Sequence, residues 1–129
     1  MGKNVVFVDD SATVLMSVEM ALEPLISDGT LVLTTYNNPV ELLDHVKSGE
    51  LVYDLLITDI NMPQMNGMDL VMNLKQISHL KAIPILALTT ENSNEMKTQG
   101  KNVGLNGWIT KPFSDEKIIT AIKRVLKIR

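Results

Sequence analysis

With 129 residues, the chain has a length typical of one domain that buries most of its surface. Its hydrophobic content of 45% and charged content of 21% are ordinary for a soluble globular protein, and the absence of cysteine excludes disulfides, thiolate zinc sites and a cysteine nucleophile. A net charge of −3 argues against nucleic-acid binding, and without an apolar run long enough for a bilayer or a signal peptide we expect a cytoplasmic protein with no membrane insertion.

The N-terminal half of the chain alternates apolar strands with helical patterns. A strand at 5–8 is followed by apolar residues at helical spacing, and Pro24 should limit how far that helix continues. A second strand at 31–36 precedes Asn38-Pro39, which has the pattern of a helix cap followed by proline in the first turn. The buried face of this second helix should consist of Val40, Leu43 and Val46.

The C-terminal half continues the alternation. A strand at 55–58 leads to a third helical pattern, and a strand at 85–88 leads to the polar, glycine-containing segment 92–102, which should form the least stable helix. The last strand, at 108–110, is followed by Ser114, a favourable residue for capping the final helix. The apolar positions that mark the third helix are Leu70, Val71, Leu74 and Ile77.

This alternation predicts the fold class. Strands separated by helices favour parallel pairing through right-handed crossovers, and near-continuous apolar strands indicate a sheet that is covered on both faces. We therefore expect an α/β fold in which a doubly wound, flavodoxin-like sheet of five parallel strands, in the order 2-1-3-4-5, carries five helices. Residues 1–129 should form a single domain, because no linker or repeat interrupts the pattern.

Chemically useful side chains follow four of these strands. They are Asp9 and Asp10 after the first strand, Asp59 after the third, Thr89 after the fourth and Lys111 after the fifth. In the expected strand order, strands 1 and 3 are neighbours at the topological switch point, where such sheets bind ligands. Each residue alone has a structural explanation, such as a helix cap or a turn, but their conjunction at one edge of the sheet indicates a site.

The residue types at this edge predict a particular chemistry. Three clustered carboxylates cannot all stay ionised without a cation, because like charges at short range disfavour one another. Mg²⁺ meets that need, since it takes carboxylate oxygens together with water and phosphate oxygens. A carboxylate is also a nucleophile that can form an aspartyl phosphate, for which Thr89 and Lys111 would supply a hydroxyl and a positive charge.

Other phosphate-handling motifs do not fit the sequence. The chain has neither the Gly-x-x-x-x-Gly-Lys-Ser/Thr pattern of a P-loop nor the Gly-x-Gly-x-x-Gly pattern of a dinucleotide site. Haloacid-dehalogenase-type phosphatases carry their aspartyl nucleophile on the first strand in Asp-x-Asp, and the run Asp9-Asp10-Ser11 breaks that pattern.

Taken together, these motifs resemble the receiver domain of response regulators, in particular its stand-alone chemotaxis members of the CheY type. The resemblance covers essentially the whole chain. It is carried by Asp9-Asp10, by Asp59 with Asn61-Met62-Pro63 and Gly67, by Thr89, and by Lys111-Pro112-Phe113.

The resemblance implies a phosphoacceptor and a metal site. Asp59 is the expected phosphoacceptor and one ligand of Mg²⁺. Asp10 is expected to be the principal protein ligand of the metal, with Asp9 helping through water and the backbone carbonyl of Asn61 completing the site.

The resemblance also implies how the phosphoryl group is held and read. Thr89 and Lys111 are expected to bind the phosphoryl group, and the Lys111-Pro112 peptide bond is expected to be cis. Asn61 and Glu91 stand at positions that tune the phosphoryl lifetime. The residues expected to act in switching and output are Thr90, Glu91, Trp108 and Pro112.

Two residues depart from the usual pattern of the family. Trp108 stands where a Tyr or Phe is usual, so its larger indole should make inward packing sterically harder. Thr90 stands where a smaller residue is common, and it should narrow access to the site.

The expected function is that of a phosphorylation switch in a two-component system, without turnover of a free substrate. A histidine kinase would supply the phosphoryl group, the domain would catalyse its own dephosphorylation, and the output would be binding to a target protein such as a flagellar motor switch component. The alternatives are a phosphorelay intermediate, a receiver cut from a larger regulator, and an interaction module that works without phosphate. Direct binding to nucleic acid is not expected.

Overall fold

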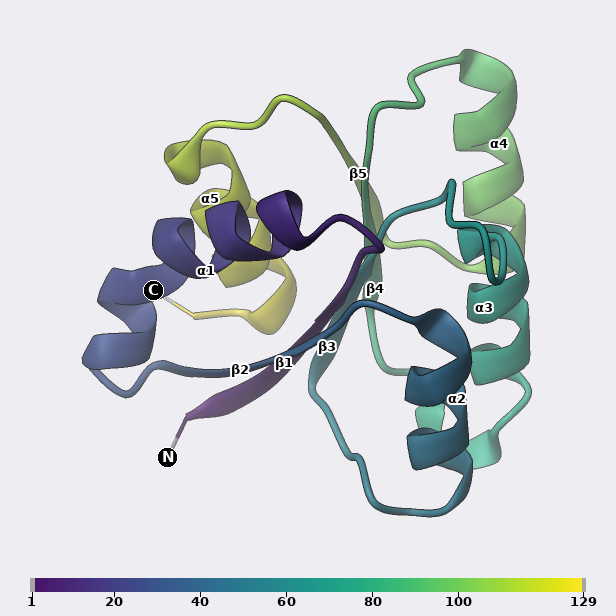
Figure 1. Ribbon diagram of the computed structural model, residues 1–129, viewed down its shortest axis with the longest axis horizontal. Helices are drawn as coiled ribbons and strands as arrows, with labels where there is room; N and C mark the ends of the chain where they lie inside the picture. The colour runs from purple at the N-terminus through teal and green to yellow at the C-terminus, as the bar shows by residue number, and fades with distance from the viewer. Residues whose placement is uncertain (1, 129) are drawn as a thin grey trace.

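The computed structural model describes residues 2–128, which form a parallel sheet with helices on both faces (Figure 1). The strands are β1 (Lys3–Val8), β2 (Leu31–Tyr36), β3 (Leu55–Thr58), β4 (Ile85–Thr89) and β5 (Gly107–Thr110). The helices are α1 (Ala12–Ser27), α2 (Pro39–Lys47), α3 (Gly67–Lys75), α4 (Asn94–Val103) and α5 (Asp115–Leu126), with a short 3₁₀ turn η1 (Ser78–Leu80). The order of the strands is β2-β1-β3-β4-β5, so the predicted fold class and topology are confirmed.

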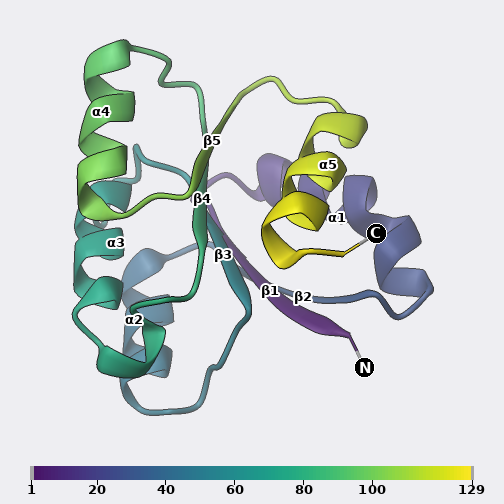
Figure 2. The same ribbon diagram turned by 180° about the vertical axis from the view of Figure 1, so that it is seen from behind.

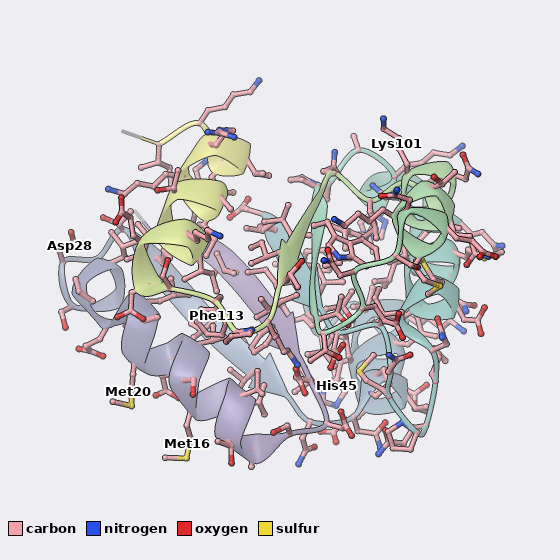
Figure 3. All side chains as sticks on the ribbon, turned by 90° about the horizontal axis from the view of Figure 1, so that it is seen from above. Met16, Met20, Asp28, His45, Lys101 and Phe113 are labelled. Carbon is pink, nitrogen blue, oxygen red and sulfur yellow. The ribbon has the colours of Figure 1, made fainter. Side chains whose placement is uncertain are left out.

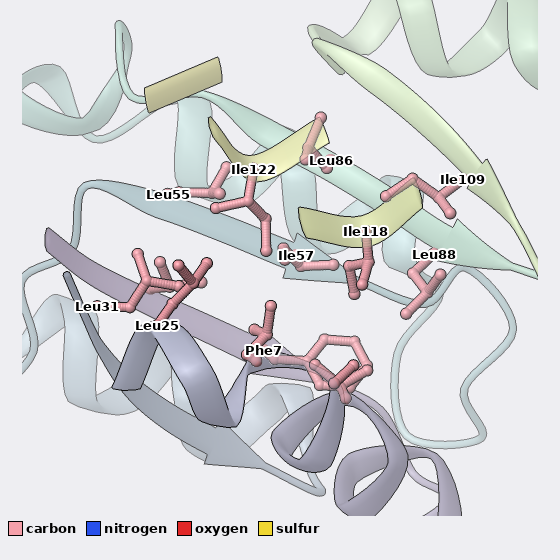
Figure 4. Packing of buried hydrophobic residues seen from close by; sticks show 14 residues of the cluster. Phe7, Leu25, Leu31, Leu55, Ile57, Leu86, Leu88, Ile109, Ile118 and Ile122 are labelled. Carbon is pink, nitrogen blue, oxygen red and sulfur yellow. The ribbon is translucent and has the colours of Figure 1, made fainter. Parts of the chain in front are cut away.

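Two apolar layers hold the helices against the sheet. Helices α1 and α5 lie on one face, and α2, α3 and α4 lie on the other (Figures 1 and 2). Because successive strand residues point to opposite faces, Val5 and Phe7 pack beneath α1 and α5 while Val6 and Val8 pack beneath α2 and α3. Figure 4 shows the first of these layers, where Ile118 and Ile122 of α5 meet the sheet. Within residues 2–128, no helix combines the length and the apolar character that a membrane span requires.

Strand register brings the functional side chains to one edge of the sheet. Val8 of β1 is paired with Thr58 of β3, so the next residues, Asp9 and Asp59, leave adjacent strands at the same level. The backbone N–H of Asp59 extends this ladder by donating to the carbonyl of Val8 at 3.1 Å. The parallel sheet therefore places the two carboxylates side by side before any side-chain contact is considered.

All five helices begin with a Ser or Asn whose side chain accepts a hydrogen bond from the first turn. The capping residues are Ser11, Asn38, Asn66, Ser93 and Ser114. Such caps satisfy backbone N–H groups that have no partner within the helix, and each is worth about 1 kcal/mol. The predicted caps at Asn38 and Ser114 are confirmed.

The helix boundaries correct three details of the sequence-based picture. Helix α1 passes through Pro24 and ends at Ser27; Pro24 is exposed, so water can satisfy the carbonyl that the proline leaves unpaired. In α2, Val40 is 40% exposed, and Leu42 takes a buried place instead. Ile77 lies beyond the end of α3, because its N–H bonds to the carbonyl of Leu74, three residues back, and tightens the chain toward η1.

Candidate functional site

Three carboxylates converge at the carboxyl edge of β1 and β3. Asp9, Asp10 and Asp59 each contribute an oxygen, and these oxygens lie within 4.8 Å of one another. Asp9 is fully buried and Asp59 is 7% exposed, whereas Asp10 is open to solvent. This gradient leaves one acid facing water and two facing the protein, so the cluster has an inner and an outer side.

Lys111 bridges the two inner carboxylates. Its Nζ atom donates to Oδ2 of Asp9 at 2.7 Å and to Oδ2 of Asp59 at 3.0 Å. Lys111 follows β5, two strands away from β3, and its N–H donates to the carbonyl of Thr89 at 2.8 Å, which fixes where its long side chain starts. The expectation that Lys111 reaches the acid cluster is confirmed.

Backbone N–H groups orient the same two carboxylates. Oδ1 of Asp9 accepts from the N–H of Ser11 at 2.9 Å, and Oδ1 of Asp59 accepts from the N–H of Ile60 at 2.6 Å. Each carboxylate therefore turns one oxygen toward the backbone and the other toward Lys111. Both side chains are held in a single orientation, which is the condition for a precise reaction geometry.

Burial perturbs the charges of this cluster. Desolvation raises the pKa of the Asp9 carboxyl, and the hydrogen bond from Lys111 opposes that rise. For Lys111, burial alone would lower the pKa, but the hydrogen bonds to Asp9 and Asp59 outweigh burial and leave the pKa raised. The ammonium is thus firmly charged, and it partly neutralises a site that carries three acids.

Gly67 closes the loop that follows Asp59. Its N–H donates to the carbonyl of Ile60 at 2.7 Å, and a Cβ atom at this position would lie 2.2 Å from the carbonyl oxygen of Asp59. Only glycine allows the start of α3 to approach the backbone of the central acid so closely. The glycine seen in the sequence motif therefore has a steric reason to be there.

Glu91 connects the expected phosphoryl-binding and output residues. Its N–H donates to Oγ1 of the buried Thr89 at 3.3 Å, and its carboxylate accepts from the side-chain amide of Asn61 at 3.0 Å. Its backbone carbonyl accepts a hydrogen bond of 2.8 Å from Nε1 of Trp108. One residue of the β4–α4 loop therefore contacts three of the residues that the sequence singled out.

The remaining predicted positions border this network. The Lys111-Pro112 peptide bond is cis, as expected. Thr90 and Pro112 are exposed, and together with Lys111 and Phe113 they line an open hollow of about 500 Å³ that also reaches Val14 of α1. This hollow gives solvent a route to the edge of the acid cluster.

The expectation that Trp108 would pack inward only with difficulty is wrong. The indole is partly buried against Ile60, Met68 and Ala87, with its N–H bonded to the carbonyl of Glu91. Sequence reasoning treated Gly100 only as a weak point of α4, whereas the structure places it against the Trp108 ring. The signal was an isolated glycine inside a helix, which often has a packing reason.

Comparisons with known proteins agree with this geometry. A family model described as the response regulator receiver domain matches residues 5–123. The chain is 33% identical over 110 residues to the chemotaxis protein CheY-3 of Vibrio cholerae, an alignment that spans 85% of this chain and 81% of that protein. The solved structure of the Vibrio cholerae chemotaxis protein CheY4 superposes with a TM-score of 0.85 at 36% identity, covering 97% of this chain and 99% of that one.

A further relative places the same kind of domain inside a larger protein. The sensor histidine kinase CheAY of Helicobacter pylori is 30% identical over 124 residues, which is 96% of this chain. The chain spans only 15% of that kinase. Relatives of this domain therefore include both short chemotaxis proteins and parts of long multidomain ones.

Proposed function

Because this chain belongs to the response regulator receiver family, we propose that it is a phosphorylation switch that accepts a phosphoryl group on the carboxylate of Asp59. The observation that carries the proposal is the Lys111 ammonium, which lies 3.0 Å from Oδ2 of Asp59 and 2.7 Å from Oδ2 of Asp9. A fixed cation beside an oriented carboxylate can offset the charge of an incoming phosphoryl group.

A divalent cation fits the oxygen donors of this site. The oxygens of Asp9, Asp10 and Asp59 lie within 4.8 Å of one another, and hard oxygen donors of this kind suit Mg²⁺. The side chain of Asn61 is engaged by Glu91, so any contribution of Asn61 would come from its backbone carbonyl. When bound, Mg²⁺ would neutralise carboxylate charge and attract phosphoryl oxygens.

The proposed transfer balances without further reactants. The P–N bond of a kinase phosphohistidine breaks, the imidazole leaves with the bonding electron pair, and an oxygen of Asp59 bonds to phosphorus. Lys111 would then lie against a phosphoryl oxygen, and the hydroxyl of Thr89 would turn to donate to another. Later attack by water at phosphorus would return Asp59 and inorganic phosphate, with Asn61 and Glu91 beside the site to set the rate.

The output would be a change in affinity for a protein partner. Thr90, Glu91, Trp108 and Pro112 lie between the acid cluster and the surface of α4, β5 and α5, and the Glu91–Trp108 hydrogen bond supports a path between them. Eight of the twelve Lys and Arg residues of the chain, but only two of its fifteen acids, lie from residue 97 onward. This distribution favours a target with an acidic docking segment.

Positive side chains stand around a groove on that surface. Lys97 and Lys101 line a hollow of about 360 Å³ together with Leu105 and Trp108. Figure 3 shows Lys101 at the outer surface of α4. An amphipathic acidic segment could place apolar residues on the indole and carboxylates beside the lysines, which makes direct binding to the flagellar motor switch, as in chemotaxis, the form of output we favour.

The chemotaxis relatives support a single receiver domain over residues 1–129 that acts in the cytoplasm between a histidine kinase and a motility target. The kinase relative supports a second candidate, in which the domain works within a larger regulator or as a phosphorelay intermediate. The two candidates share the chemistry at Asp59 and differ only in the partner.

Labelling with a small acyl phosphate tests the proposed chemistry. In the presence of Mg²⁺, intact-mass measurement should show addition of one phosphoryl group to the native chain. The Asp59→Asn variant should gain none, whereas Asp69→Asn, which removes an exposed acid of α3, should label normally. Chelation of the metal by EDTA should stop labelling. Equal labelling of Asp59→Asn, or undiminished labelling in EDTA, would refute the proposal and leave a phosphate-independent interaction module.

A further inference from the structure

Trp108 and Gly100 pack against each other across the space between β5 and α4. Gly100 is buried, and a Cβ atom placed on it would lie 3.0 Å from Cζ3 and 3.4 Å from Cε3 of the indole. The same atom would lie 2.7 Å from Cδ1 of Leu105. The six-membered edge of the indole thus occupies the space that any other residue at position 100 would fill.

The indole has little freedom to retreat from such a side chain. Its opposite end is fixed by the 2.8 Å hydrogen bond from Nε1 to the carbonyl of Glu91. Its backbone is held in the sheet, where Trp108 is paired with Ala87 of β4. Leu105 can move aside because only the tip of a flexible side chain is involved, so the Trp108 ring is the contact that limits the residue at position 100.

Glycine is otherwise a poor choice at this position. Gly100 lies inside α4, where every non-proline residue favours a helix more than glycine does. Helix formation alone would therefore favour alanine. The cost of keeping glycine here is explained if the missing Cβ atom serves the neighbouring indole.

We propose that Gly100 is the positioning residue that admits Trp108 to its inward place, so that residues 100 and 108 are a matched pair. With a larger residue at position 100, the indole leaves the carbonyl of Glu91 and turns to solvent. Its effect on signalling rests on the function proposed above: Glu91 also contacts Thr89 and Asn61, so an expelled indole is uncoupled from the phosphorylation site.

Fluorescence of the protein without any phosphoryl donor tests the steric part directly. Trp108 is the only tryptophan of the chain, so the emission reports one position. Gly100→Ala should shift the emission to longer wavelength and increase quenching by acrylamide, and Gly100→Leu should do so more strongly. Gln99→Leu, which places the same side chain at an exposed position of the same helix, should leave both signals unchanged. Unchanged emission in both Gly100 variants would overturn the proposal.

A second measurement separates the contact from general damage to α4. Gly100→Ala should lower the urea midpoint of unfolding in the native chain. In a Trp108→Phe background, where the clashing ring atoms are absent, the same substitution should raise the midpoint, because only the better helix propensity of alanine remains. A decrease of the same size in both backgrounds would mean that Gly100 acts independently of Trp108, and the matched pair would be rejected.

The signalling consequence has its own readout. Gly100→Leu should still accept a phosphoryl group from an acyl phosphate, but beryllofluoride, a phosphoryl mimic, should no longer change the tryptophan emission. A Gly100→Leu protein whose emission responds as in the native chain would contradict the coupling. If the native chain itself does not label, the proposed function fails while the fluorescence and unfolding tests of the Gly100–Trp108 contact still stand.

Discussion

The ammonium of Lys111 lies 3.0 Å from Oδ2 of Asp59, although the two residues are 52 positions apart in sequence. The contact crosses the carboxyl edge of the sheet from β5 to β3, over the end of β4. The same nitrogen contacts Asp9 at 2.7 Å, so one cation serves both inner acids. A group that replaces this cation, or competes for it, acts on the whole acid cluster.

Removing Lys111 should destabilise the protein in a pH-dependent manner. Lys111→Ala leaves the buried Asp9 without its countercharge, for which we expect a loss of about 2 kcal/mol or more in the free energy of unfolding at pH 7. Without the lysine, the already raised pKa of Asp9 rises further. A carboxyl with a raised folded-state pKa contributes stability below its unfolded pKa and loses it as the pH increases, so the variant should recover stability as the pH falls from 7 toward 4.

Urea unfolding at several pH values measures this effect. Lys47→Ala, which removes an exposed lysine of α2, should lose little stability at any pH. A Lys111→Ala deficit that stays the same from pH 7 to pH 4 would show that Asp9 is not the source of the loss.

Thr89 should matter for transmission rather than for accepting the phosphoryl group. Thr89→Ala removes the hydroxyl that the N–H of Glu91 uses, a change worth about 1 kcal/mol, and leaves Lys111 and the acid cluster in place. We expect labelling by an acyl phosphate at a rate within a few-fold of native and loss of phosphorylation-dependent binding to the target. Thr90→Ala, which alters an exposed neighbour, is the matched control. Native-like target binding by labelled Thr89→Ala would count against this role.

Tryptophan emission should follow the phosphoryl group rather than the metal. Trp108 contacts the carbonyl of Glu91, whereas the acid cluster lies on the other side of the β4–α4 loop. We expect a small change in fluorescence on adding Mg²⁺, a larger one on adding beryllofluoride, and a reduced second response in Thr89→Ala. Shifts of this kind need about 1–3 kcal/mol of differential interaction between two states. If Mg²⁺ alone produces the full change, the indole reports the metal site instead.

Gly67 should tolerate no side chain. In Gly67→Ala, the new Cβ atom would stand 2.2 Å from the carbonyl oxygen of Asp59, and both are anchored by backbone. We expect a loss of about 3 kcal/mol or more in the free energy of unfolding, together with slower labelling of Asp59. Gly49→Ala is the comparison: nothing lies near its Cβ position, but its φ of +81° costs about 1 kcal/mol for a non-glycine residue. Equal losses in the two variants would argue against the clash.

Tyr53 should weaken the protein at alkaline pH. Burial raises the pKa of its phenol to about 12, and among residues 2–128 its hydroxyl has no hydrogen-bond partner. The unfolded chain therefore loses this proton near pH 10 while the folded chain keeps it, so stability falls between pH 10 and 12 by up to about 1.4 kcal/mol per pH unit. Tyr53→Phe should remove that part of the decrease without loss at pH 7. Tyr36→Phe, whose hydroxyl is bonded to His45, should remove less of it.

Local sequence patterns were sufficient to predict the framework of this protein. Apolar strands separated by capped helices allow few arrangements other than a parallel, doubly wound sheet, because right-handed crossovers restrict the topology. In that sheet, residues that follow strands 1 and 3 must be neighbours, so Asp9 and Asp59 were predictable as a pair. The caps at Asn38 and Ser114 were predictable for a similar reason, since capping depends on residues three or fewer positions away.

Tertiary structure decided what depends on packing between distant elements. Whether Val40 or Leu42 of α2 is buried depends on how the helix rests on the sheet, and both satisfy the same helical spacing. The contacts that Glu91 makes with Asn61 and Trp108, and the approach of Trp108 to Gly100, join segments that have no local signal for one another. Side chains of this kind settle into the space that remains after the backbone has folded, so only the assembled sheet and helices determine where they lie.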